Sequence, residues 1–198
     1  MKISFDKSDI NFYFSFQCPY SYLAWTQLCK ILSNNDKINV KPINVGIDNA
    51  VSNKYSFRKQ WGGERWLRLS NEAKQLGITM SKPLKEVPEL LASRSIEYFG
   101  SSGVEYYITT IFKAVFSANI DISITNTLRY FLQSEGNDSE LIIKASEDPK
   151  TLVKANENID QWGKKRIRLL PTIEIGSERI AGYLTQREIE NLLRSLVD

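Results

Sequence analysis

Four consecutive residues, Cys18, Pro19, Tyr20 and Ser21, are the part of this chain best suited to chemistry. A cysteine reacts as its thiolate, and the chain contains no histidine that could serve as the base. A thiol becomes reactive without histidine when it stands at the start of a helix, where unpaired backbone N–H groups and the helix dipole favour the anion. The chemistry expected of Cys18 is therefore that of a stabilised thiolate.

The segments on either side of Cys18 predict this placement. Apolar side chains alternate along residues 10–16, which is typical of a strand. Along residues 22–32 they recur at steps of three and four, which is typical of a helix. Proline is favoured in a first helical turn, so Pro19 indicates that the helix begins directly after Cys18. The alternative is that Cys18 is an inert, buried cysteine.

The second cysteine, Cys29, is a poor disulfide partner for Cys18. If both lie on one helix they are about three turns, or ~15 Å, apart, whereas a disulfide needs Cα atoms within about 7 Å. Cys29 falls on the apolar side of the predicted helix and is expected to be a small core residue.

Composition narrows the class of protein. The 198 residues, 42% hydrophobic and 25% charged, suffice for one domain or one domain with an insertion. A net charge of +3 gives no indication of nucleic-acid binding, and the basic run at residues 164–168 is expected to be a solvated loop. No apolar stretch approaches the ~20 residues that span a bilayer. The N-terminus lacks the apolar core of a secretory signal, so a cytoplasmic location is the expectation.

Several cofactors are not expected. Two distant cysteines and no histidine argue against a transition-metal site, and no glycine-rich phosphate loop indicates a nucleotide.

The remaining segments predict an α/β fold. Residues 38–45 alternate like a strand, residues 63–160 are helical almost throughout, and residues 169–175 and 179–181 form a hairpin. Asp148 and Pro149 fit a helix start, and residues 185–188 form a capping box that opens a final helix. A strand–helix–strand unit needs a parallel pair and the hairpin an antiparallel pair, so one mixed sheet with helices on both faces is expected.

This order, with Cys18-Pro19 after the first strand and Pro171 before the third, resembles a thioredoxin-like fold of the DsbA-like group. The resemblance implies a four-stranded mixed sheet flanked by helices, in a discontinuous domain of residues 1–62 and 161–198, with an all-helical subdomain inserted at residues 63–160. Residues 12–24 are most similar to 2-hydroxychromene-2-carboxylate isomerases and kappa-class glutathione transferases.

Within that group, Cys18 falls on the catalytic serine of the isomerases, whose segment reads Ser-Pro-Tyr-Ser. Ser21 falls on the second cysteine of the disulfide oxidoreductases, which have Cys-Pro-X-Cys, so a dithiol cycle would need a resolving thiol from elsewhere. Pro171 falls on the cis-proline of the group, and the resemblance implies that backbone groups of Leu170 bind the peptide-like part of glutathione.

The resemblance also implies further contacts with glutathione as a co-substrate. Asn53 and Lys59 look like the asparagine and lysine that hold it in the kappa class. Thr185 and Gln186 fall on a pair whose aspartate binds the γ-glutamyl ammonium, and the neutral Gln186 makes a weaker contact than that aspartate. Two further sets of residues are considered for the site: Pro19, Tyr20 and Tyr22 beside the thiol, and Phe57, Trp61 and Trp66, which either line an apolar pocket or pack the insertion onto the sheet.

The function expected is a glutathione-linked enzyme: an isomerase, a kappa-type transferase or a monothiol disulfide oxidoreductase. In the first two, Cys18 donates a hydrogen bond to the glutathione thiolate, which attacks an electrophilic carbon. In the third, Cys18 itself forms a mixed disulfide that free glutathione resolves. The partners expected are a small electrophile or a mixed disulfide, with no nucleic acid or membrane, and a homodimer is left open. The alternatives are a non-catalytic module that binds a peptide or protein, and a cysteine redox sensor.

Overall fold

The computed structural model describes residues 8–33, 38–45, 62–86, 88–99, 103–183 and 185–194. Within them lies a 4-stranded sheet of order β2-β1-β3-β4, built from β1 (Ser8–Phe14), β2 (Ile38–Asn44), β3 (Thr172–Ile175) and β4 (Glu178–Ala181). Strand β1 pairs in parallel with β2 and antiparallel with β3, and β3 pairs antiparallel with β4. The thioredoxin-like mixed sheet predicted from the sequence is confirmed.

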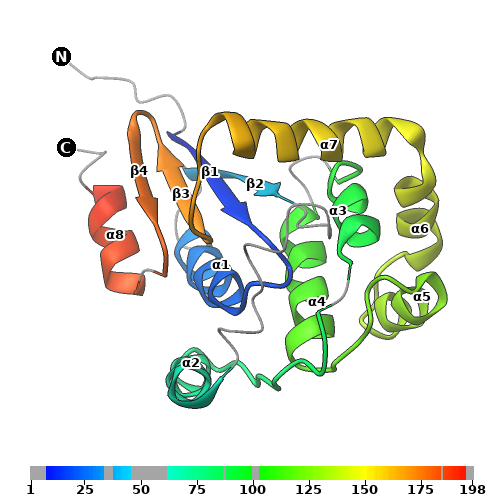
Figure 1. Ribbon diagram of the computed structural model, residues 1–198, viewed down its shortest axis with the longest axis horizontal. Helices are drawn as coiled ribbons and strands as arrows, with labels where there is room; N and C mark the ends of the chain where they lie inside the picture. The colour runs from blue at the N-terminus through cyan, green and yellow to red at the C-terminus, as the bar shows by residue number, and fades with distance from the viewer. Residues whose placement is uncertain are drawn as a thin grey trace.

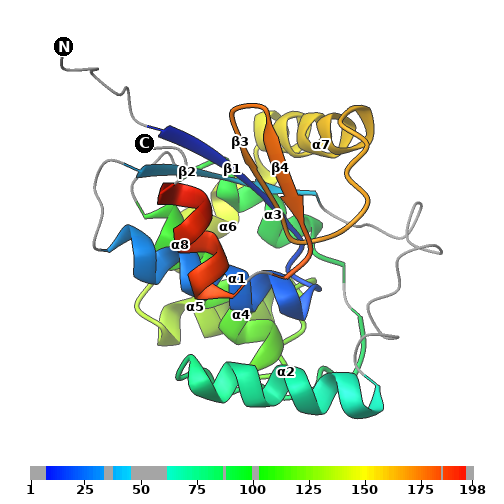
Figure 2. The same ribbon diagram turned by 90° about the vertical axis from the view of Figure 1, so that its left-hand side faces the viewer.

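Eight helices accompany the sheet in the described residues. They are α1 (Pro19–Leu32), α2 (Gly63–Gln75), α3 (Leu90–Ile96), α4 (Val104–Phe116), α5 (Thr125–Ser134), α6 (Ser139–Glu147), α7 (Pro149–Lys164) and α8 (Gln186–Arg194). Figure 1 shows α1 and α7 on opposite sides of the sheet, with α3 to α6 grouped together to one side of it. Helix α2 lies apart from that group, below α1, in both Figure 1 and Figure 2.

Alternation along β1 separates two hydrophobic clusters. Ile10, Phe12 and Phe14 are fully buried in the main core, whereas Tyr13 points to the other face and packs in a smaller cluster with Ile43. Simple alternation of apolar and polar residues would give a strand one buried face. In β1 both faces are buried, as expected for a central strand of a sheet that has helices on either side.

The main core continues from the sheet into the helical segment. The ring centroids of Phe14 and Phe112 are 5.7 Å apart, and those of Tyr22 and Phe112 are 5.1 Å apart. Trp25 Nε1 donates to Thr109 Oγ1 at 3.0 Å, which ties α1 to α4. Helix α7 continues unbroken through residue 160, where a domain boundary is expected from the sequence. The division into residues 1–62 with 161–198 and an insertion of 63–160 stays a prediction.

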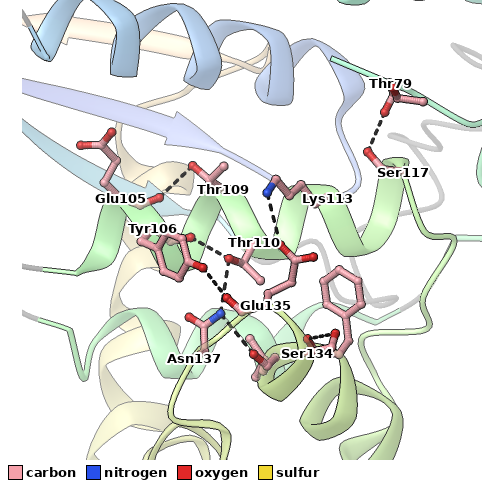
Figure 3. Close-up of polar contacts among 12 residues, drawn as sticks. Thr79, Glu105, Tyr106, Thr109, Thr110, Lys113, Ser117, Ser134, Glu135 and Asn137 are labelled. Atoms are coloured by element: carbon pink, nitrogen blue, oxygen red, sulfur yellow. Dashed lines mark hydrogen bonds and ion pairs between the residues drawn. The ribbon is translucent and has the colours of Figure 1, made fainter. Parts of the chain in front are cut away.

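Polar contacts join α4 to its neighbours in the helical segment (Figure 3). Lys113 Nζ lies 3.2 Å from Glu135 Oε2 at the end of α5, and the Tyr106 hydroxyl donates to the Glu135 carbonyl. Ser117 Oγ at the end of α4 donates to the Thr79 carbonyl at 2.6 Å. These bonds fix the end of α5 and the chain after α2 against a single helix.

Local start signals read from the sequence are confirmed. Asp148 caps α7, its carboxylate accepting from Lys150 N at 2.8 Å, with Pro149 in the first turn. The capping box is also present: Glu188 Oε2 accepts from Thr185 N at 2.7 Å, and Thr185 Oγ1 accepts from Glu188 N at 3.4 Å.

Some side chains lie differently from the expectation. Leu67 on α2 and Tyr106 on α4 are large apolar residues of the predicted helical segment, where they would be expected to be buried, yet they are 62% and 52% exposed. The basic run at 164–168 is not simply a solvated loop, because Lys165 pairs with Glu174 on β3 and Ile167 is buried. No helix in the described part of the chain is long and apolar enough to cross a membrane.

Candidate active site

The turn between β1 and α1 positions Cys18 as the sequence predicts. Cys18 is the N-cap residue of α1, in an extended conformation, and Pro19 occupies the first turn. Its N–H donates to the Ser15 carbonyl at 3.1 Å, and its carbonyl accepts from Ser21 N at 3.0 Å. The Cys18 side chain makes no capping bond to its own helix, so the sulfur is directed to other groups.

Those groups come from the loop before β3 and from α2. Cys18 Sγ donates to the Leu170 carbonyl at 3.5 Å, and the Leu170–Pro171 peptide bond is cis. The cis geometry implied by the resemblance is confirmed. Tyr20, Trp66 and Leu170 pack against Cys18, which is fully buried. Residues separated by more than 150 positions thus meet at the thiol.

The expected thiolate is the principal correction. Burial raises the pKa of Cys18 to about 11, although the Ser21 hydroxyl and the backbone N–H groups of Ser21 and Tyr20 pull it down. The helix terminus therefore acts as the sequence suggests, but removing the sulfur from water has the larger effect. At neutral pH Cys18 is a protonated thiol and a hydrogen-bond donor.

Among polar side chains, Ser21 lowers the pKa of the Cys18 thiol the most. It is fully buried. Its Oγ makes no hydrogen bond of ordinary geometry, yet the hydroxyl lies close enough to Cys18 to favour the thiolate. A buried hydroxyl without a partner is unfavourable by about 1–3 kcal/mol, so this atom marks a place where a further polar group would be accommodated.

A pair of tyrosines leads from Cys18 toward α8. The ring centroids of Tyr20 and Tyr183 are 5.8 Å apart, and Gln27 Nε2 donates to the Tyr183 hydroxyl at 3.1 Å. Burial, together with the nearby Glu72 carboxylate, raises the pKa of Tyr183 to about 12. Thr185 lies two residues after Tyr183. The contacts of Tyr20 with Cys18 and with Tyr183 therefore connect the thiol to the segment that precedes α8.

Thr185 and Gln186 are already engaged at that helix start. Glu188 accepts from both the N–H and the hydroxyl of Thr185 at 2.7 Å, and Gln186 Nε2 donates to Glu190 Oε1 at 2.9 Å. Both residues are exposed. Their predicted role in binding glutathione stays a prediction.

Asn53, Lys59, Phe57 and Trp61 lie outside the described residues. Of the three aromatic residues considered for a pocket, Trp66 is described, and it contacts Cys18. Cys29 is partly buried against the main core, with a pKa raised by burial and by Glu105, which agrees with a packing role. Among the described residues there is no group of three histidine, cysteine, aspartate or glutamate side chains that could hold a metal.

Sequence reasoning missed Glu89. This carboxylate, the N-cap residue of α3, is fully buried and accepts from Ser15 Oγ at 2.7 Å and from Phe16 N at 2.5 Å. An acidic residue between Pro88 and the apolar Leu90 looks like an ordinary helix start, so the sequence carried no sign that its side chain reaches the turn that holds Cys18.

Comparison with known proteins decides the family. The profile of the DSBA-like thioredoxin domain matches residues 9–194, which is nearly the whole chain. The chain belongs to the DSBA-like thioredoxin domain family. A search of curated protein sequences finds no match.

Solved structures agree with this DSBA-like fold. A 2-hydroxychromene-2-carboxylate isomerase superposes with a TM-score of 0.77 at 18% identity, over 96% of each chain. A probable DsbA oxidoreductase from Streptomyces coelicolor gives 0.78 at 14% identity, over 96% of this chain and 91% of the other. A cytosolic disulfide reductase from Pseudomonas aeruginosa, solved with GSH, gives 0.63 at 9% identity, over 96% and 98%.

As a DSBA-like domain, this chain combines features of two kinds of relative. It carries Cys18 before Pro19 and a serine at position 21, where the resemblance implies the first and second cysteines of the disulfide oxidoreductases. The structure joins Cys18, Ser21, Leu170 and Pro171 in one place. The site therefore holds one thiol, a neighbouring hydroxyl and the cis-proline loop.

Proposed function

We propose that this chain is a glutathione-dependent enzyme of the isomerase or transferase type, in which Cys18 acts as a protonated thiol. The observation that carries the proposal is the fully buried Cys18 beside the Leu170–Pro171 loop, with a pKa raised to about 11 by burial. A neutral S–H group donates a hydrogen bond and is a poor nucleophile. The substrate is a small electrophile with an unsaturated or aromatic carbon.

The sulfur end of glutathione suits the residues around Cys18. A thiolate placed there would accept from the Cys18 S–H, which now donates to the Leu170 carbonyl, and from the Ser21 hydroxyl, which is buried without a partner. It would also face the first turn of α1, whose N–H groups favour an anion. The γ-glutamyl end of glutathione would have weaker contacts, because Gln186 is neutral and Glu188 already accepts from the N–H of Thr185.

Glutathione binds as its thiolate, after the thiol proton has passed to solvent. The thiolate adds reversibly to the electrophilic carbon of the substrate: the carbon–sulfur bond forms as the adjacent π bond breaks, and that electron pair moves into the conjugated system of the substrate. The residues of this chain hold and stabilise the thiolate. Cys18 and Ser21 donate to the sulfur while it is anionic and weaken its nucleophilicity less than full hydration would. Trp66 and Tyr20, which pack on Cys18, keep water from the site. The Leu170 carbonyl accepts the hydrogen bond of the Cys18 S–H whenever no thiolate is present.

The monothiol redox route receives less support from the same geometry. With a pKa near 11, only about one Cys18 in ten thousand would be a thiolate at pH 7. A redox sensor needs an accessible, low-pKa thiol, which Cys18 is not. Glutathione as a co-substrate suits a reducing compartment, so the cytoplasm remains the proposed location.

Calorimetric titration of the reduced protein with glutathione tests the proposal. Wild type, Cys18→Ser and Cys18→Ala are compared, with Cys29→Ser as the matched control for loss of a thiol outside the site. We expect binding by wild type, Cys29→Ser and Cys18→Ser, and at least about tenfold weaker binding by Cys18→Ala, because one hydrogen bond to a charged sulfur is worth about 1.5–3 kcal/mol.

Activity assays separate the routes. Addition of glutathione to an unsaturated aromatic electrophile is expected to survive in Cys18→Ser, which keeps a donor. Reduction of a mixed disulfide that is present in wild type and abolished in Cys18→Ser would instead support the redox route. Absence of glutathione binding and of both activities in wild type would leave a non-catalytic binding module and refute the proposal.

A further inference from the structure

Glu89 lies at the end of β1 although it belongs to the helical segment. As the N-cap residue of α3 it would be expected to bond to its own helix, but its side chain makes no such bond. Its carboxylate instead accepts from the Ser15 hydroxyl at 2.7 Å and the Phe16 N–H at 2.5 Å, both 70 or more positions away in sequence.

The same hydroxyl connects Glu89 to the thiol. Ser15 Oγ accepts from Gln17 N at 3.0 Å while it donates to Glu89, and the Ser15 carbonyl accepts from Cys18 N at 3.1 Å. Ser15, Phe16 and Gln17 are thereby held on one side by Glu89 and on the other by Cys18. The conformation of this turn decides where the sulfur lies relative to the Leu170 carbonyl.

The end of a second strand holds Glu89 itself. Asn44 Nδ2, at the end of β2, donates to Glu89 Oε2 at 3.2 Å. Ser93 Oγ, one turn along α3, contacts both Asn44 Oδ1 and the Glu89 carbonyl oxygen at 2.7 Å. All of these residues are buried. Their bonds join the ends of β1 and β2 to the start of α3 around one carboxylate.

Glu89 also acts on Cys18 through its charge. Among the influences on the pKa of Cys18, burial is the largest, and the negative charge of Glu89 adds to it in the same direction. Tyr20 and Ser21, on α1, act in the opposite direction through their N–H groups and the Ser21 hydroxyl. A fixed anion behind the turn thus helps to keep the thiol protonated.

We propose that Glu89 is a positioning residue of the thiol site, which clamps the turn of residues 15–17 to the ends of β2 and α3 and so holds Cys18 as a neutral donor beside Leu170. The inference rests on the proposed function, in which a protonated Cys18 is the useful form. It adds a residue at the start of α3 to a site otherwise built from α1, α2 and the cis-proline loop.

The test has two readouts, both in a Cys29→Ser background so that one thiol reports. The pKa of Cys18 is measured from the ultraviolet absorbance of its thiolate as a function of pH, which needs no reagent to reach the buried sulfur. The rate of alkylation by iodoacetamide measures how often the site opens. Glu89→Gln keeps the shape but removes the charge and one acceptor. Glu89→Asp keeps the charge, and Ser15→Ala keeps the carboxylate but removes the hydroxyl link. Glu174→Gln, a buried carboxylate of β3 with no bond to the turn, is the matched control. Circular dichroism confirms that each variant is folded.

Relative to wild type, we expect Glu89→Gln to carry about three times more Cys18 thiolate at pH 8.5, which corresponds to a fall of about half a unit in the pKa of Cys18. Glu89→Asp should restore the pKa to within about 0.2 units. Ser15→Ala should be alkylated about three times faster at every pH, because the lost bond loosens the turn and the site opens more often. Glu174→Gln should match wild type.

Equal effects of Glu89→Gln and Glu174→Gln would show general loosening and overturn the proposal. An unchanged pKa of Cys18 in Glu89→Gln together with unchanged alkylation in Ser15→Ala would overturn it as well. If Glu89→Gln fails to fold, Ser15→Ala alone decides between these outcomes. None of these measurements uses glutathione. Failure of glutathione to bind would therefore refute the proposed function without touching this result.

Discussion

Two buried carboxylates of this protein have different partners among the described residues. Glu89, at the end of β1 behind the thiol, accepts from a hydroxyl, a backbone N–H and an amide. Glu174, on β3, pairs with the cations Lys165 and Arg179 and also accepts from Asn11 and Tyr13.

The surroundings of the two carboxylates differ as well. Beside the turn that Glu89 contacts, Cys18 is a protonated thiol, whereas near Glu174 the Lys165 ammonium lies 5.4 Å from the Tyr13 ring centroid. Hydrogen bonds from a hydroxyl, a backbone N–H and an amide fix the direction in which a carboxylate points. Attraction to a cation depends less on direction. The turn that positions the sulfur uses bonds of the first kind, and β3 has contacts of the second kind in addition.

Replacing Glu89 by alanine should have the largest effect on stability. Three buried donors would lose their acceptor, and each is worth about 1–3 kcal/mol, so we expect a loss of about 4 kcal/mol in the free energy of unfolding. Urea unfolding monitored by circular dichroism measures it. A loss below about 1 kcal/mol would mean that water or a shifted turn satisfies these donors, and the contrast between the two carboxylates would disappear.

Cys18→Ser should change how stability responds to alkali. Because the folded-state pKa of Cys18 is raised from 9.0 to about 11, burial of the thiol costs no stability below the unfolded pKa and removes stability progressively as pH rises toward 11. Wild type should therefore lose about 2–3 kcal/mol more than the variant between pH 8.5 and 11. Unfolding curves at several pH values test this; parallel losses in both proteins would indicate a normal thiol.

Glu174→Gln should have a smaller effect with the opposite pH dependence. Burial alone would raise the pKa of Glu174, but bonds from Lys165, Arg179 and Asn11 lower it to about 2 from 4.5. Its contribution is present above pH 4.5 and is lost as pH falls toward 2. Since both cations are 37% exposed, we expect a deficit of only about 1–2 kcal/mol at pH 7. Thermal unfolding at pH 7 and pH 2, with and without 1 M salt, should show the deficit shrinking in acid and in salt.

Gln186→Asp should have the smallest effect, a change in the affinity for glutathione. An aspartate at the start of α8 would offer a charged acceptor to the γ-glutamyl ammonium implied by the resemblance, so glutathione should bind about tenfold more tightly, or ~1.4 kcal/mol. Calorimetry measures this, with Gln186→Asn as the neutral control. Equal affinity in both variants would place the ammonium elsewhere.

Much of the fold follows from signals within short stretches of sequence. Alternation from Ile10 to Phe14, the proline after Cys18 and the box from Thr185 to Glu188 each act over a few residues, and each is present in the structure. The cis bond at Pro171 was different, because nothing nearby in sequence requires it and the resemblance alone implied it.

The state of the thiol could not be predicted in the same way. The helix start that favours the anion is local, whereas the burial that outweighs it comes from Trp66 and Leu170, which are 48 and 152 positions away. Glu89 escaped notice for the same reason, because its partners are 73 and 74 positions away. Helix and strand boundaries could be inferred from neighbours in the chain, but contacts between distant segments, and the pKa values that depend on them, could not.

The contact between Trp66 and Cys18 makes the site optically visible. Sulfur atoms quench indole emission at contact distance, so the fluorescence of Trp66 depends on what lies against the thiol. In a variant whose other three tryptophans are replaced by phenylalanine, the fluorescence of Trp66 would change, without any label, each time a ligand displaces the indole from the sulfur.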